Sequence, residues 1–429
     1  MRILLLSTYE MGRQPFGLAS PAAWLRRAGY FVRAVDLSRD RLPDGAVENS
    51  DLIALYLPMH TATVLALKLL PALKGKNPGA RFAAYGLYAP INAGALRKAG
   101  VEAILGGEFE QGLVDWARGE TAPEVSLGRQ QFVMPERGEL PDAARYAELM
   151  GLGEPRVAGY TEASRGCKHL CRHCPIVPVY GGAFRIVQRD VVLADIRQQV
   201  AGGARHVTFG DPDFFNGPGH AMALVEALHE EFPDVSYDVT IKVEHLLKHR
   251  SLLAVLKRTG CVFVTSAVES VDDAVLARFA KHHTRADFVE AVALMREVGL
   301  CLSPTFVAFT PWTSREGYGE LLRAVADLGL IENVAPVQWA IRLLVPAGSL
   351  LLPYLETQEF DEQRLVYPWV HPDPEMDRLA LTVAKIVAAD RGSRRDVFER
   401  VWQAAHEQPL DFLIPDRIGV PYLNEPWYC

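Results

Sequence analysis

Short apolar runs alternate with amphipathic stretches over the first 125 residues of the chain. The apolar runs predict buried strands at residues 2–7, 31–37, 52–57, 81–85 and 103–105, and the amphipathic stretches predict helices at 21–28, 63–73, 93–99 and 110–117. This order is typical of a parallel, doubly wound α/β sheet with helices on both faces. We therefore expect residues 1–125 to form one Rossmann-like (flavodoxin-like) domain, with any ligand at the carboxyl ends of its strands.

Residues 126–155 carry three prolines and no sustained period, which predicts a linker or a short connecting hairpin. Longer strand and helix units follow, with strands expected at 156–163, 205–209, 236–242, 261–267, 300–309 and 338–345 and helices between them. Six such units predict a partial (β/α)6 TIM barrel over 156–345, whose active residues should lie at the carboxyl ends of the strands. Residues 346–429 are expected to form a helical accessory region with an extended C-terminal tail.

Composition narrows the functional class. The chain is 49% hydrophobic and 23% charged, as an ordinary globular protein is. A net charge of −7 and the lack of a long basic run argue against nucleic acid as the main partner. No apolar run approaches the length that a membrane span needs, so we expect no membrane association. Six cysteines, three of them clustered, fit a reducing cytoplasm in which thiols stay free for metals.

Three of the six cysteines lie within eight residues, in the spacing Cys167-x3-Cys171-x2-Cys174. Three thiolates on one short loop can bind three irons of a [4Fe-4S] cluster and leave the fourth iron open. A structural zinc site would need a fourth ligand at matching spacing, and no second CxxC or HxxxH follows. A zinc knuckle or a redox trio of thiols is the alternative.

This spacing resembles the signature of the radical S-adenosylmethionine (radical SAM) superfamily, in which the open iron chelates the amino and carboxylate groups of SAM. The residue before the third cysteine is usually aromatic there; here it is His173, whose ring is also planar. The resemblance implies a [4Fe-4S] cluster, bound SAM and an electron donor such as a flavodoxin or ferredoxin, because reductive cleavage of SAM needs a low-potential cluster.

The N-terminal domain, placed before this motif, resembles the cobalamin-binding domain of cobalamin-dependent radical SAM enzymes. The turn formed by Gly106, Gly107 and Glu108 is similar to one that those domains place near the nucleotide tail of cobalamin. No DxHxxG motif occurs, so no histidine from that motif can ligate cobalt. Met59 and His60 follow the third strand, and they could approach the lower cobalt face or simply pack at the sheet edge. A dinucleotide-binding or receiver module is disfavoured, because GxGxxG and an acidic pair are absent after the first strand.

Further candidate residues lie at the ends of the predicted barrel strands: Gly210, Asp211, Asp213, Lys242, Glu244, Glu269, Ser270 and Thr305. By the resemblance, the FGDPDF run binds the amino group of SAM, and the AVES run lies next to SAM. Lys242 and Glu244 could meet the ribose or the carboxylate, and Thr305 could line the adenine or substrate site. Acidic turn residues are more often helix caps, which is the alternative for the two aspartates.

The motifs SRGC, CRHCP, FGDPDF, IKVEH and AVES are most similar to an uncharacterised group of cobalamin-dependent radical SAM enzymes with short cysteine-containing tails (CUAEP or CCAEP). This chain departs from that pattern and ends in Asn-Glu-Pro-Trp-Tyr-Cys. Cys429 could be inert, or it could reach the barrel mouth as a redox group, a hydrogen donor or an iron ligand.

The resemblance implies a methyltransferase that acts on an unactivated carbon of a small-molecule or peptide substrate. In that family one SAM methylates the cobalamin, and a second SAM gives a 5′-deoxyadenosyl radical that removes hydrogen from the substrate. Three alternatives stay open. A carboxylate such as Glu244, or Cys429, could occupy the open iron and leave polar methyl transfer. The enzyme could instead perform radical rearrangement, oxidation or epimerisation. The chain could also be a non-catalytic sensor.

Overall fold

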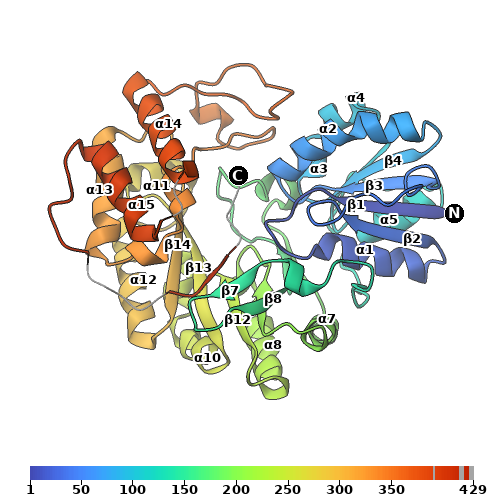
Figure 1. The fold of residues 1–429 in the computed structure, drawn as a ribbon, viewed down its shortest axis with the longest axis horizontal. Coiled ribbons are helices and arrows are strands. Elements are labelled where there is room, and N and C mark those ends of the chain that lie inside the picture. Colours follow the sequence, from blue (N-terminus) through green and yellow to red (C-terminus); the bar gives the residue numbers. More distant parts are fainter. Residues whose placement is uncertain (390–391, 415–419, 425–429) are drawn as a thin grey trace.

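The computed structural model describes residues 1–389, 392–414 and 420–424. Figure 1 shows two α/β units side by side, a layered N-terminal sheet in blue and a larger curved sheet in green to orange. Two further helices, in orange and red, pack together beside the end of the curved sheet that lies away from the N-terminal sheet. The described residues include no helix that is long and apolar enough to cross a membrane.

The N-terminal sheet has the order β2-β1-β3-β4-β5-β6, and its strands pair in parallel. Its strands are β1 (Arg2–Ser7), β2 (Phe31–Asp36), β3 (Leu52–Tyr56), β4 (Arg81–Tyr85), β5 (Ala103–Gly107) and β6 (Val125–Ser126). Its helices are α1 (Phe16–Arg27), α2 (His60–Lys76), α3 (Tyr88–Ile91), α4 (Ala93–Lys98) and α5 (Glu110–Ala117). Every residue of β3 is buried, because apolar cores cover both faces of the sheet. This is the doubly wound arrangement that the alternating pattern predicts.

The second sheet has the order β14-β13-β12-β11-β8-β7-β15. Five strands run in parallel: β8 (Arg156–Thr161), β11 (His206–Phe209), β12 (Ser236–Thr240), β13 (Cys261–Glu269) and β14 (Cys301–Phe306). Two short strands, β7 (Glu148–Met150) and β15 (Tyr422–Leu423), extend it antiparallel at the β8 edge. A separate hairpin pairs β9 (Ser164–Gly166) with β10 (Phe184–Ile186).

Helices cover the outer face of this curved sheet (Figure 1). They include α7 (Arg189–Ala201), α8 (Pro218–Glu231), α10 (Leu253–Arg258), α12 (Arg285–Val298) and α13 (Arg315–Asp327). The remaining helices are α6 (Val177–Tyr180), α9 (Val243–Lys248), α11 (Asp273–Phe279), α14 (Pro374–Ala389) and α15 (Arg394–His406). Short 3-10 helices occupy Ala143–Arg145, Phe214–Asn216, Arg250–Leu252, Ile331–Asn333, Pro336–Trp339 and Leu352–Tyr354. The predicted fold class is thereby confirmed.

Helix α12 illustrates how the sequence determines this packing. A capping box between Thr284 and Asp287 starts the helix, and Gly299 ends it in the left-handed region at φ 73°. Between these ends, buried residues recur at helical spacing. Among them, Phe288 meets Phe306 of β14 edge to face, with ring centroids 6.2 Å apart. The apolar stripe of the helix therefore packs on the outward face of the strand.

The sixth predicted barrel strand, at residues 338–345, is wrong as a strand. The segment begins in a 3-10 helix and makes a single parallel bridge between Phe309 and Arg342. The side-chain oxygen of Gln338 accepts the backbone N–H of Phe306 at 2.8 Å, in the place where a strand carbonyl would bond. This apolar run next to a proline thus contacts the edge of the sheet through a side chain. The period of hydrophobic residues cannot distinguish such a segment from a strand.

The segment 126–155 is more ordered than its composition suggests, because it contributes residues to both sheets. The guanidinium of Arg137 is buried and donates to both carboxylate oxygens of Asp195 in α7, at 2.7 and 2.8 Å. The same side chain donates to Gln14 in the N-terminal domain and to the carbonyl oxygen of Tyr160 in β8. One arginine therefore fixes the connecting segment against both units.

Candidate functional site

The three clustered cysteines lie on one loop between β9 and α6. All three thiols are free, Cys171 is buried, and the other two are partly exposed. Burial raises the pKa of the Cys174 thiol to about 12. A thiol in such surroundings stays protonated unless a cation stabilises its thiolate, which is what an iron ligand requires.

Gly166 starts this loop with φ 74°, a backbone conformation that residues with a side chain rarely adopt. A Cβ atom at this position would lie 2.4 Å from a ring carbon of Tyr180 and 2.5 Å from the carbonyl oxygen of Ala183. The glycine of the SRGC run is therefore required by both backbone conformation and close packing.

The distal half of the loop is held by α11 and the end of β13. The N–H of Arg172 donates to the carbonyl oxygen of Phe279 at 2.9 Å, and the ring of His173 stacks on Phe279 at 4.4 Å. His173 Nε2 also lies 3.0 Å from Glu269 Oε1. The ring of His173 is thus held between Phe279 and Glu269.

Glu269 is buried at the end of β13 with φ 69°. Its carboxylate lies 3.4 Å from Lys281 Nζ as well as beside His173. Burial opposes ionisation of this carboxyl group, but Lys281 and His173 outweigh that cost and lower its pKa to about 2. Its neighbour Ser270, also predicted to lie next to SAM, accepts the N–H of Asp272 at 3.0 Å.

Asp211 and Gly210 sit directly after β11, and both contact the barrel's first strand or the residues that follow it. Asp211 accepts hydrogen bonds from the N–H of Ala163 and the hydroxyl of Ser164, and burial raises its pKa to about 7 against these bonds. A Cβ atom on Gly210 would lie 2.0 Å from the Tyr160 hydroxyl oxygen. The glycine thus permits close approach of a protein side chain here, where we expected a ligand.

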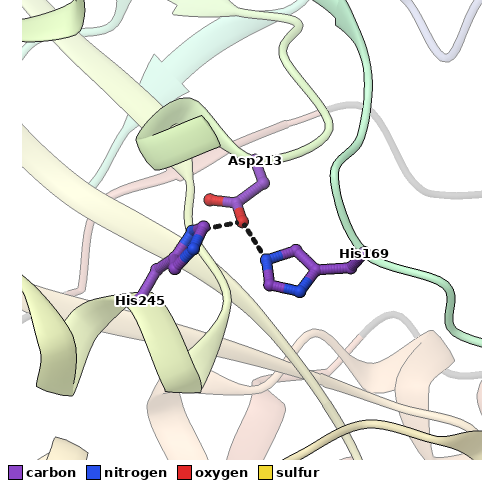
Figure 2. Close-up of side chains that lie close together, drawn as sticks. All are labelled: His169, Asp213 and His245. Atoms are coloured by element: carbon purple, nitrogen blue, oxygen red, sulfur yellow. Dashed lines mark ion pairs between the residues drawn. The ribbon is translucent and has the colours of Figure 1, made fainter. Parts of the chain in front are cut away.

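Figure 2 shows a second group of polar side chains beside the cysteine loop, formed by His169, Asp213 and His245. His169 comes from the loop itself, Asp213 precedes the 3-10 helix Phe214–Asn216, and His245 lies in α9. Asp213 Oδ2 is 2.7 Å from His245 Nδ1 and 3.3 Å from His169 Nε2. The fold therefore brings the cysteine loop and the ends of β11 and β12 to one point.

Lys242 and Glu244 follow β12 and lie beside the group of His169, Asp213 and His245. Lys242 Nζ and His169 Nδ1 each lie 3.5 Å from Glu244 Oε2, and about a third of the Glu244 side chain is exposed. Thr305, in β14, lines a large cavity inside the curved sheet. Cys429 lies outside the described residues.

In the N-terminal domain, the predicted Gly106-Gly107-Glu108 turn lies at the end of β5. Glu108 is fully buried, accepts a hydrogen bond from the Tyr180 hydroxyl at 3.1 Å, and lies 3.8 Å from Arg165. Burial raises the pKa of Glu108 to about 7, against the opposing effect of Arg165. Pro90 packs 2.5 Å from the position that a Cβ atom on Gly106 would take, and Gly107 has φ 68°.

Met59 and His60 lie at the start of α2. Met59 packs against the apolar core of the sheet. His60 donates from Nε2 to the carbonyl oxygen of Arg364 at 2.7 Å, and burial lowers its pKa. The structure thus links His60 to the C-terminal region through one ring nitrogen.

Arg165, which the sequence did not single out, joins the two units through buried carboxylates. Its guanidinium donates to both oxygens of Glu110 at 2.9 and 2.7 Å and to Glu162 at 2.5 Å. Phe16, Phe109 and Phe132 surround it with their rings. The residue two positions before Cys167 is therefore anchored in the N-terminal domain.

Comparison with known proteins agrees with this geometry. Residues 161–315, which include the cysteine loop and the strands around it, match the family model of the radical SAM superfamily. The chain contains a radical SAM domain. Among curated proteins, the hopanoid C-3 methylase of Methylococcus capsulatus is 24% identical over 347 residues, which cover 75% of this chain and 66% of that protein. The chain therefore spans just under two thirds of the length of this relative.

Solved structures extend the likeness to the N-terminal domain. The cobalamin-dependent S-adenosylmethionine radical enzyme OxsB, solved with aqua-cobalamin and S-adenosylmethionine, matches 89% of this chain and 66% of its own at a TM-score of 0.66 and 12% identity. The radical S-adenosylmethionine methyltransferase TsrM of Kitasatospora setae, solved with cobalamin and a [4Fe-4S] cluster, matches 76% of this chain and 73% of its own at a TM-score of 0.60 and 16% identity. The shared feature is the fold.

Next to the radical SAM domain, a cavity of about 1350 Å³ extends from the inside of the curved sheet to the C-terminal region. Thr265 and Thr305 line it from β13 and β14, and Arg342 and Trp369 line it from the opposite side. Arg342 lies over the Trp369 ring at 3.6 Å and donates to Asp377 at 2.6 Å. Its mixed wall of hydroxyls, apolar side chains and paired charges suits a ligand with polar and apolar parts.

Several side chains around the site were not named as site residues from the sequence. They are Arg165, His169, Asn216, His245 and Lys281. His169 and His245 stand inside the CKHLC and IKVEH runs, so their position next to predicted site residues was the only available indication.

Proposed function

We propose that this protein is a cobalamin-dependent radical SAM enzyme, and that it methylates an unactivated carbon of a small-molecule or peptide substrate. The observation that carries the proposal is the gathering of Cys167, Cys171 and Cys174 on one braced loop inside the segment that matches the radical SAM superfamily. The methylase relative and the fold shared with two cobalamin-binding enzymes support the methyl transfer.

The cysteine loop fits a [4Fe-4S] cluster. It supplies three thiols, and the part of the chain that the structure describes has no fourth cysteine on this loop. Its partial burial would shield the irons from water. Lys281 contributes a positive charge that favours the thiolate form of Cys174. When bound, the cluster and SAM supply radical chemistry and cobalamin carries the methyl group. A flavodoxin or ferredoxin is the proposed electron donor, and the cytoplasm the proposed location.

The residues that would hold SAM remain part of the proposal. Asp211 and Glu269 are already bonded to protein groups, so they act first by fixing the loop on which SAM would bind. Lys242, Ser270 and Thr305 are the proposed polar contacts of SAM.

The N-terminal domain fits a large polar cofactor at the carboxyl ends of its strands. Among the described residues, Ser7 Oγ, Glu10 Oε2, Asn92 Oδ1 and Glu108 Oε2 are buried there without a hydrogen bond. Buried polar atoms are normally satisfied, so a group of them at one sheet edge suits a ligand with many amides and hydroxyls such as cobalamin. We propose that Gly106, Gly107 and Glu108 approach its nucleotide tail and that Met59 lies toward its lower face.

The large cavity is the proposed substrate chamber. Its volume of about 1350 Å³ exceeds the roughly 300–1,000 Å³ that is usual for small-molecule sites, and residues of the radical SAM domain and of the C-terminal region both line it. A small molecule or a peptide segment with an apolar part would satisfy these walls. We also propose that the chain belongs with the group that carries short cysteine-containing tails.

Polar methyl transfer is a second candidate, favoured by the partly exposed Glu244 carboxylate beside the loop histidine His169. In that case Glu244 would occupy the open iron in place of SAM. Spectroscopy that detects the nitrogen of SAM on the unique iron would eliminate this candidate.

The first test is iron, sulfide and cobalamin analysis of anaerobically purified protein, with Cys167→Ala alongside. We expect four sulfides, the four irons that they match and bound cobalamin in the wild type, and loss of the cluster in the variant. Four irons without cobalamin after growth in its presence would overturn the methyltransferase proposal and favour non-methylating radical chemistry. Product mass then separates methylation from rearrangement or oxidation.

A further inference from the structure

The group of His169, Asp213 and His245 has the composition of a metal site. Its three ligand atoms, His169 Nε2, Asp213 Oδ2 and His245 Nδ1, all lie within 4.8 Å of one another. Two donor atoms that bind one zinc or iron ion at about 2 Å each lie roughly 3 Å apart. The measured separations of 2.7 and 3.3 Å from Asp213 Oδ2 match that value.

Each of these atoms is buried and lacks a hydrogen bond among the residues that the structure describes. Asp213 is fully buried, and the side chains of His169 and His245 are 11% and 8% exposed. Both separations are ion-pair distances, which Figure 2 marks with dashed lines, but none of the three atoms makes a regular hydrogen bond. Three buried polar atoms that converge at one point without a regular hydrogen bond favour a cation between them.

The remaining polar atoms of Asp213 and His169 are directed elsewhere. Asp213 Oδ1 accepts the N–H of Phe215 at 3.2 Å, and His169 Nδ1 faces Glu244 Oε2 at 3.5 Å. Metal-binding histidines commonly direct their second ring nitrogen to a carboxylate, which fixes the tautomer and the ring orientation. The neighbouring groups therefore leave His169 Nε2, Asp213 Oδ2 and His245 Nδ1 available to bind an ion.

We propose that His169, Asp213 and His245 bind one divalent transition-metal ion, zinc or ferrous iron, in addition to the cluster. Two neutral imidazoles and one carboxylate form the donor set of three-ligand zinc sites and of non-haem iron sites. The ion would add positive charge near the carboxylates of Asp213 and Glu244. The other neighbours of these carboxylates are the two histidines and Lys242.

The position of the ion defines its role. His169 lies between Cys167 and Cys171, whereas Asp213 and His245 follow β11 and β12. A bound ion would therefore cross-link the cysteine loop to two strand ends, and it would keep the loop in place before the cluster is assembled. Asp213 would then serve as a metal ligand and not as a contact for the amino group of SAM.

Elemental analysis of anaerobically purified protein tests the site without relying on activity. The sulfide content measures the cluster alone, because the cluster holds one iron for each sulfide. We therefore expect one equivalent of zinc or iron in addition to an amount of iron equal to the sulfide. His245→Gln and Asp213→Asn should lose this equivalent, so that the metal in these variants no longer exceeds the iron that their sulfide matches. His249→Gln is the matched control, since its ring contacts His245 at 5.5 Å but is not one of the three ligands. Wild-type protein with no zinc or iron beyond the iron that its sulfide accounts for would overturn the proposal.

A second measurement keeps the proposal testable if these variants fold poorly. The variant with Cys167→Ala, Cys171→Ala and Cys174→Ala cannot hold the cluster, so any tight site that remains is separate from it. We expect this protein to bind one equivalent of Zn²⁺ by titration calorimetry, and to lose the binding when His169→Gln is added. No binding of Zn²⁺ or Fe²⁺ would contradict the inference and would leave the proposed enzyme function untouched.

Discussion

Glu269 Oε1 lies 3.0 Å from His173 Nε2, although 96 residues separate the two side chains. The contact joins the end of β13 to the residue directly before Cys174. Because Lys281 approaches the same carboxylate oxygen, Glu269 is ionised in the fold and orients the imidazole ring. The geometry of the cysteine loop thus depends on a strand that lies far along the sequence.

Glu269→Gln should destabilise the protein and lower its cluster content. A fall of the Glu269 pKa from 4.5 to about 2 corresponds to roughly 3 kcal/mol in favour of the folded state. Since the folded-state pKa is depressed, this contribution is present above pH 4.5 and is lost as the pH falls toward 2. Urea unfolding of the cluster-free protein at pH 7, followed by tryptophan fluorescence, measures the loss of stability.

The control for this variant is Glu290→Gln, because Glu290 pairs with Arg250 on the exposed surface. We expect it to leave both stability and iron content nearly unchanged. If Glu269→Gln were equally silent, the ion pair would not hold the cysteine loop.

Glu108→Gln should flatten the pH dependence of stability. Burial raises the pKa of Glu108 from 4.5 to about 7, so the folded state binds its proton more tightly than the unfolded state does. The wild type therefore loses up to about 3 kcal/mol from this group as the pH rises from 4.5 to 7. The glutamine variant should lose less over that interval, and unfolding curves of the two proteins at pH 5, 6, 7 and 8 give the difference. Parallel curves for both proteins would show that Glu108 is ionised throughout.

Arg137→Met should cost about 3–5 kcal/mol, because it leaves the buried Asp195 carboxylate without its bidentate cation. Thr161 and Gln198 still donate to Asp195, but neither brings a positive charge. Arg197→Met serves as the matched control, since Arg197 binds Glu231 in a similar two-bond pairing on the exposed surface of α7 and α8. Equal unfolding midpoints for the two variants would contradict a structural role for Arg137.

Thr305→Trp should block the proposed substrate chamber. The indole would occupy part of the cavity that Thr305 lines, so we expect turnover to fall at least tenfold while iron, sulfide and cobalamin stay at wild-type levels. Thr305→Val, which removes the hydroxyl at almost the same volume, tests the polar contact separately. Normal turnover in the tryptophan variant would place the substrate elsewhere.

Local sequence patterns predicted most of the strands and helices. Contacts between residues far apart in the sequence could not be predicted from these patterns. The alternation of apolar runs gave the doubly wound sheet and most of the barrel strands, because each element shows its period over a few residues. The spacing of Cys167, Cys171 and Cys174 indicated a metal-binding loop for the same reason. The pairing of His173 with Glu269 depends on chain topology, which no local window contains. The apolar run at 338–345 looked like a sixth strand from sequence alone. In the structure the side chain of Gln338 makes a hydrogen bond that a strand carbonyl would otherwise make, and the segment is not a strand.

The candidate site shows the same division. Residues in recognisable runs, such as Asp213 and Glu244, were identified, but their partners His169 and His245 were not. Asp211 and Glu269 were expected to contact SAM, whereas the structure shows each of them bonded to protein groups of the loop assembly. The structure therefore gathers these strand-end residues in one region, and the hydrogen-bond network was needed to describe what each side chain contacts.

The pairing of β15 with β7 has a consequence for how the protein is made. Strand β7 is synthesised before the whole radical SAM domain, but its partner at Tyr422–Leu423 follows every other described element. Until translation reaches that point, the outer edge of β7 presents unpaired backbone groups that can pair with other chains. A chain shortened before residue 420 should therefore aggregate during expression even though it keeps all three clustered cysteines.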